Sequence, residues 1–246
     1  MLDKRGQLSY QKELNAIRQA KEAADFKNDA HNKGWGIYGS DNVYYAYTFG
    51  LPYDFFKSRV DTTKYATGRM PCGLDVMSNT AFLRSLGIEG IAIGFTKDEA
   101  EVRAEEPYNR HLIAGDILAD RKKIWTEVDT MMTTYNFING FDFITLRGAG
   151  GLVSLSDNPI VYHVLLQEMW KRLAVGGILV SEVPYVSQNL IKETNIIGYW
   201  NLTKGIKADY VSRGISLEKS DGAPMQLPLN FSPLLSTIRD WHKGLF

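Results

Sequence analysis

The chain has 246 residues, 44% of them hydrophobic and 23% charged, and its 28 basic and 28 acidic side chains give a formal net charge of zero. This composition argues against a disordered chain, and the balanced charge argues against nucleic-acid binding by bulk electrostatics. No apolar run reaches the roughly 18 residues of a membrane helix, and the first residues lack a secretory apolar stretch. A single cysteine, Cys72, excludes an internal disulfide. We therefore expect a soluble cytoplasmic protein without a membrane partner.

Residues 1–70 are expected to form an extension that precedes the main domain. Residues 7–32 have the mixed charges of a solvated helix. Residues 35–56 are rich in aromatic side chains, Tyr44 and Tyr45 among them, and are broken by glycines and a proline, so they are not predicted to form one long regular element. This stretch is either a lid that stacks on a planar substrate or an adenine, or an apolar cluster that ties the extension to the domain.

From residue 71 onward, short apolar strands alternate with helices. This alternation indicates βαβ units, so we predict that residues 71–246 form a Rossmann-like, doubly wound α/β domain with a mostly parallel sheet. The glycines at 176 and 177 are expected to end the last long helix. The predicted strands are 73–77, 90–95, 111–114, 141–146, 178–183, 211–217 and 225–231, and the predicted helices are 80–86, 97–106, 121–136 and 159–173, with one more after residue 186.

Four loops are expected to carry the chemistry. In an open parallel sheet, ligands bind at the carboxyl ends of the strands, where the strand order reverses. These ends are followed by Ser78-Asn79-Thr80, Thr96-Lys97, Asp116-Ile117 and the glycine-rich turn that begins at Arg147.

Several of these segments resemble class I S-adenosylmethionine-dependent methyltransferases over about residues 70–185. The similar features are Leu74-Asp75-Val76 with the helix after it, Gly115-Asp116 after the third strand, and Phe141-Asp142-Phe143-Ile144 before a long helix and Gly176-Gly177. The resemblance implies S-adenosylmethionine as the cofactor, a final antiparallel hairpin, and methyl transfer to a small or peptide-like acceptor.

The chain departs from the family's pattern in two places. The turn Met77-Ser78-Asn79-Thr80-Ala81 has no glycine where the family has a glycine-rich turn, and Gly94 or Phe95 stands where an acidic residue usually holds the ribose hydroxyls. The closest resemblance is to a divergent branch with the turn Arg147-Gly148-Ala149-Gly150-Gly151. These departures leave open a catalytically inactive, methyltransferase-like binding or assembly module. A nicotinamide-dependent oxidoreductase is disfavoured because the chain lacks the Gly-x-Gly-x-x-Gly loop.

Each predicted cofactor residue also has a structural alternative. In the structural alternative, Asp75 caps the adjacent helix or bonds to backbone groups. The polar residues after it are residue types preferred as helix N-caps, and Gly115-Asp116 is typical of an ordinary turn. Asp116 lies where the family's residue contacts the adenine amino group, and a carboxylate can accept that hydrogen bond. The cofactor residues implied by the resemblance are Asp75, Ser78, Asn79, Thr80, Phe95, Thr96, Asp116 and Ile117.

Arg147 is the residue from which most chemistry is expected. A guanidinium at the end of a buried strand needs an anion or a group of acceptors, and the flanking Gly148 and Gly150 allow a ligand to approach the backbone closely. We predict that Arg147 is a catalytic-site residue that binds a carboxylate or phosphate of the substrate, or the cofactor's carboxylate, with Tyr44 and Tyr45 as further substrate contacts. The alternative is an ion pair with Asp75 or Glu182. The histidines lack the spacing of zinc ligands, so no metal is predicted.

Overall fold

The computed structural model describes residues 41–78, 80–94, 110–115, 117, 120–147, 159–183, 195–212 and 214–228. The predicted helices 7–32 and 97–106 lie outside these residues. The helices are α3 (Asn42–Phe49), α4 (Phe55–Thr67), α5 (Ala81–Leu86), α6 (Arg121–Thr134), α8 (Pro159–Arg172) and α10 (Ile196–Asn201). The strands are β1 (Cys72–Val76), β2 (Glu89–Gly94), β3 (Arg110–Ala114), β4 (Phe141–Leu146), β5 (Leu173–Glu182), β6 (Ile206–Val211) and β7 (Gly214–Lys219).

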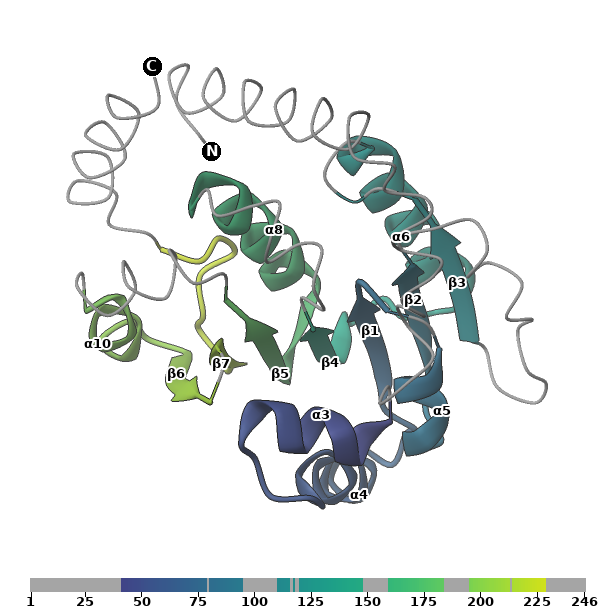
Figure 1. The fold of residues 1–246 in the computed structure, drawn as a ribbon, viewed down its shortest axis with the longest axis horizontal. Coiled ribbons are helices and arrows are strands. Elements are labelled where there is room, and N and C mark those ends of the chain that lie inside the picture. Colours follow the sequence, from purple (N-terminus) through teal and green to yellow (C-terminus); the bar gives the residue numbers. More distant parts are fainter. Residues whose placement is uncertain are drawn as a thin grey trace.

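The strands form one sheet in the order β3-β2-β1-β4-β5-β7-β6 (Figure 1). Strands β1 to β5 pair in parallel, whereas β7 lies antiparallel between β5 and β6. The chain is thus a Rossmann-like α/β domain with a mostly parallel sheet, as the sequence predicted. The antiparallel β6–β7 hairpin closes one end of the sheet.

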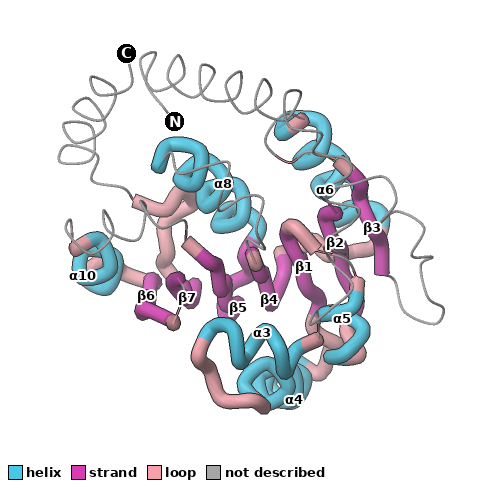
Figure 2. Tube along the Cα trace, in the orientation of Figure 1, coloured by secondary structure: helices cyan, strands magenta, loops and turns pink. Residues whose placement is uncertain are grey.

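Helices cover both faces of the sheet (Figure 2). Helices α6, α8 and α10 pack on one face, where Leu74 and Val76 of β1 join their apolar side chains. Helices α3, α4 and α5 pack on the other, against Phe143 of β4 and Val180 of β5. Because side chains alternate along a strand, Asp75 points to the α3 side of the sheet.

The aromatic segment at the N-terminal end of the described chain forms two helices, which the sequence analysis did not predict. Helix α3 ends at Gly50, whose N–H donates to carbonyls of the last turn, and Pro52 lies before α4. The segment is therefore not one regular element, as expected. Tyr45, Phe49 and Phe56 are buried in the cluster with Phe82 and Phe143, which supports the packing interpretation for these side chains, whereas Tyr44 and Tyr47 remain exposed.

Of the two strands predicted near the end of the chain, 211–217 was displaced: it overlaps β7 at residues 214–217 but also includes the turn after β6. The described part of the other, residues 225–228, is not a strand. In and next to the second segment, side chains of α8 and α10 form hydrogen bonds with backbone groups that would bond to a neighbouring strand in a sheet. Trp170 donates to the Pro224 carbonyl, Trp200 to the Pro228 carbonyl, and Gln167 accepts from the Leu227 N–H.

The predicted boundary between the last long helix and its strand was also displaced. Helix α8 ends at Arg172, and β5 begins at Leu173, which already pairs with Phe141. Gly176 and Gly177 therefore lie within β5, near a shift of the β4–β5 register, and do not end the helix. Among the described helices, none is long and apolar enough to cross a membrane.

Candidate functional site

The strand order reverses at β1, which lies between β2 and β4. Ligands of open α/β sheets bind at the carboxyl ends of strands at such a point. Here the pairing register places Asp75 of β1 opposite Thr145 of β4, and Ser78 and Arg147 follow the ends of the same two strands. Four polar side chains therefore meet at the expected edge of the sheet.

Asp75 is the centre of a buried hydrogen-bonded network. The Thr145 hydroxyl donates to Asp75 Oδ1 at 2.7 Å. The Tyr45 hydroxyl of α3 lies 3.0 and 2.9 Å from the two carboxyl oxygens and 2.9 Å from Ser78 Oγ. Asp75 and Thr145 have no exposed surface, and Tyr45 is 1% exposed. The described partners of Asp75 are thus side chains of β4, α3 and the turn after β1.

Burial governs the ionisation of this network. It raises the pKa of Asp75 to about 7, although hydrogen bonds from Thr145, Ser78 and Tyr45 and the charge of Arg147 favour the carboxylate. Burial, and then the negative charge of Asp75, raise the pKa of Tyr45 well above its ordinary value. The phenol is therefore a neutral donor, and Asp75 changes its charge near neutral pH.

The turn after β1 has an uncommon backbone conformation. Met77 has a φ of 64°, which is the left-handed region that non-glycine residues rarely adopt. The next residue, Ser78, donates its N–H to the Ile93 carbonyl at the end of β2 at 3.0 Å. The glycine-free turn thus adopts the kind of left-handed bend for which glycine is normally used, with a methionine in the strained position.

Arg147 makes cation–π contacts with two aromatic side chains of α3. Its guanidinium carbon lies 4.8 Å from the ring centre of Tyr44 and 5.3 Å from that of Tyr45. Contacts of this kind between a cation and aromatic rings stabilise the guanidinium. Half-buried Arg147 and exposed Tyr44 therefore lie together at this edge.

The structure brings together only some of the residues that the sequence predicted. Asp75, Ser78, Thr80 and Ile117 are buried, and the Thr80 side chain does not cap α5. Thr145 was missed, although a polar residue in register with Asp75 was a usable signal, and the bond between Tyr45 and Asp75 had no sequence signal because α3 was not predicted. Asn79, Phe95, Thr96, Asp116, Gly148 and Gly150 lie outside the described residues.

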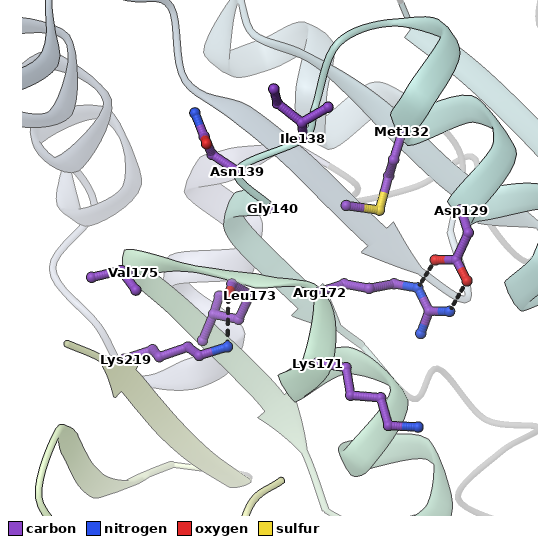
Figure 3. A pocket seen from close by; sticks show the side chains of 10 residues that line it. All are labelled: Asp129, Met132, Ile138, Asn139, Gly140, Lys171, Arg172, Leu173, Val175 and Lys219. Atoms are coloured by element: carbon purple, nitrogen blue, oxygen red, sulfur yellow. Dashed lines mark hydrogen bonds and ion pairs between the residues drawn. The ribbon is translucent and has the colours of Figure 1, made fainter. Parts of the chain in front are cut away.

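A pocket of about 410 Å³ opens at the opposite edge of the sheet (Figure 3). It lies beside the first residues of β4 and β5 and the end of β7. Its cations are engaged within the protein: Arg172 pairs with Asp129 at 2.6 Å, and Lys219 donates to the Trp170 and Leu173 carbonyls. Cations at helix carboxyl ends commonly stabilise the last carbonyls in this way. This pocket is therefore stabilised by structural cations, away from the Asp75 network.

Comparison with known proteins gives structural neighbours only. No family model and no curated protein matches the chain. Among solved structures, the MycE methyltransferase of the mycinamycin biosynthetic pathway, in complex with Mg and SAH, is 16% identical with a TM-score of 0.38 over 74% of this chain, which spans about half (52%) of MycE.

Two further neighbours carry methyltransferase names. A putative ribosomal RNA methyltransferase from Plasmodium falciparum is 19% identical with a TM-score of 0.37 and covers 70% of this chain and 98% of its own. A SAM-dependent methyltransferase from Archaeoglobus fulgidus is 13% identical with a TM-score of 0.29. Its match covers 67% of this chain and 75% of the Archaeoglobus chain. Because these values are low, no residue role is transferred from them. The parallel strands followed by the antiparallel hairpin give the chain a class I methyltransferase-like fold.

Proposed function

We propose that the chain is an S-adenosylmethionine-dependent methyltransferase. The observation that carries the proposal is the Asp75 network at the carboxyl ends of β1 and β4, where a fold of this kind binds its ligand. The compartment in which it works is proposed to be the cytoplasm.

The cofactor is proposed to lie along the ends of β1, β2 and β3. S-adenosylmethionine carries a methyl group on a positively charged sulfur, which a nucleophile accepts by direct displacement. Asp75 has its described hydrogen bonds within the protein, so its role is to hold the turn at Met77 and Ser78 in shape. Ser78, Asn79, Thr80, Phe95, Thr96, Asp116 and Ile117 are the proposed residues around the ligand.

Arg147 is proposed to bind an anionic group of the methyl acceptor, beside Tyr44, Gly148 and Gly150. A methyl displacement requires mainly that the nucleophile, methyl group and leaving sulfur are aligned and that water is excluded. A guanidinium fixed on two aromatic rings is suited to this, because its direction is set before the substrate binds.

Ligand-induced stabilisation tests the proposal. S-adenosylhomocysteine at a hundred times its dissociation constant should add about 2.7 kcal/mol to the free energy of unfolding, which raises the melting temperature by about 5–10 °C. NAD and NADP should have no effect. The Asp116→Ala variant should bind the adenosyl ligand more weakly, whereas Asp120→Ala, which removes an exposed carboxylate without a capping bond, is the matched control.

The same measurement can contradict the proposal. A shift with NAD or NADP alone would indicate an oxidoreductase. The absence of a shift with S-adenosylmethionine, S-adenosylhomocysteine and both nicotinamide cofactors would favour the inactive binding module instead. Equal adenosyl binding by both aspartate variants would remove Asp116 from the site.

A further inference from the structure

Tyr45 joins an N-terminal helix to the turn after β1. Its hydroxyl lies within 3.0 Å of both Asp75 oxygens and 2.9 Å from Ser78 Oγ, so one phenol links the end of β1 to the residue two positions beyond it. These residues are 30 and 33 positions away in the chain. The shape of the turn therefore depends on an element outside the βαβ units.

The position of this hydroxyl is set by the docking of α3. The Tyr45 ring stacks on Phe82 of α5 with centroids 4.5 Å apart and meets Phe49 edge-on at 6.3 Å. The start of α3 is fixed as well, because Asn42 makes three hydrogen bonds with Ser85 of α5 at 2.8–3.1 Å. A ring held on several sides has little freedom, so its hydroxyl is preorganised for Asp75 and Ser78.

The turn itself needs such support. The left-handed region is sterically strained for a non-glycine residue, and Met77 adopts this conformation with no glycine nearby in the turn. Strained backbone persists only where the surrounding contacts determine it. The bonds to Tyr45 and the Ser78 N–H bond to Ile93 are contacts of this kind.

We propose that Tyr45 is a positioning residue whose hydroxyl holds the Met77–Ser78 turn in the shape that receives the cofactor. The inference rests on the proposed methyltransferase function. It means that docking of α3 and binding of the adenosyl ligand favour each other, since a coupling between two binding events acts in both directions. The N-terminal helix thus completes the cofactor site.

Hydrogen exchange tests the first half of this proposal without any ligand. In Tyr45→Phe the ring and its packing remain, but the hydroxyl is lost, so the Ser78 amide should exchange about tenfold faster, as expected for the loss of one buried hydrogen bond. The Ile91 amide in β2 should exchange as slowly in this variant as in the wild-type protein. The matched control is Tyr162→Phe, which removes another buried phenol hydroxyl, 3.0 Å from Ser181 Oγ on the opposite face. It should leave the Ser78 amide unchanged.

Calorimetric titration with S-adenosylhomocysteine tests the second half. The dissociation constant should rise about tenfold in Tyr45→Phe and stay unchanged in Tyr162→Phe. Should Tyr45→Phe fail to fold, Ser78→Ala removes the same contact without touching α3 and should speed exchange of the amide at position 78. Unchanged exchange at that amide in a folded variant would overturn the proposal. If the wild-type protein bound no adenosyl ligand, the proposed function would fail while the exchange result still decided the role of Tyr45 in the turn.

Discussion

At the scale of single residues, the surroundings of Asp75 decide whether its carboxyl group is charged or neutral. Burial disfavours its charge, whereas Thr145, Ser78, Tyr45 and the nearby Arg147 favour it, and the outcome is a pKa of about 7. The folded protein therefore keeps a proton on this group that the unfolded chain has already released at its ordinary pKa of 3.8. A group of this kind destabilises the fold as the pH rises between the two values.

Asp75→Asn should remove this pH dependence. The wild-type protein should lose on the order of 4 kcal/mol of stability from Asp75 between about pH 4 and pH 7, while the variant, whose amide does not titrate, should not. Urea unfolding of both proteins at several pH values measures the difference. We expect the free-energy curves to converge or cross as the pH rises, and parallel curves over this window would contradict the assignment.

The sequence was sufficient to locate Asp75 but not to describe its surroundings. Its place at the end of a short apolar strand followed from local pattern alone. Its contact with Tyr45 did not, because that contact spans 30 positions and depends on how α3 packs on Phe82. The left-handed conformation of Met77 was likewise not predictable from a turn without glycine.

At the scale of elements, β1 and β2 approach each other through facing glycines. Gly73 and Gly90 are paired in the parallel register, and a Cβ at Gly90 would lie 1.9 Å from the Gly73 carbonyl oxygen. Gly90 also has a φ of 149°. Since β1 carries Asp75, this close pairing fixes one side of the candidate site.

Gly90→Ala should therefore destabilise the protein by about 3 kcal/mol, through the clash with Gly73 and the backbone strain. The matched control is Gly68→Ala after α4, where φ is 68° but a Cβ meets no atom within 4 Å. That change should cost about 1 kcal/mol from backbone strain alone. Denaturant unfolding at fixed pH compares the two variants, and equal losses would show that the approach of β1 and β2 is not the determining contact.

The order of elements could be predicted where local periodicity is strong, as in β1 to β4 and α6. The final antiparallel hairpin was expected and is present, but its strand β6 was missed. Half of the residues of β6 are exposed, so the strand has no continuous apolar run to mark it in the sequence. The prediction also failed at residues 225–228, since tryptophans far away in the sequence decide where those carbonyls bond.

At the scale of the whole molecule, the two edges of the sheet carry different elements. The parallel strands deliver their carboxyl ends to the Asp75 edge, whereas α6 and α8 end at the opposite edge, where their last carbonyls attract cations. Arg172 accordingly donates to the Glu168 carbonyl, and Lys219 donates to two carbonyls near the end of α8. We expect ligand binding at one edge and structural ion contacts at the other.

This division predicts that Lys219→Met will affect stability but not cofactor binding. Methionine retains an apolar stem against Trp170 but loses two hydrogen bonds, so the free energy of unfolding should fall by about 2 kcal/mol. Lys207→Met is the control in the same hairpin, because this exposed lysine pairs with Glu218 at 3.0 Å and its loss should cost about 0.5 kcal/mol. Both variants should bind S-adenosylhomocysteine as the wild-type protein does in calorimetric titration. A clear loss of affinity in Lys219→Met alone would show that the pocket edge and the Asp75 edge are energetically coupled.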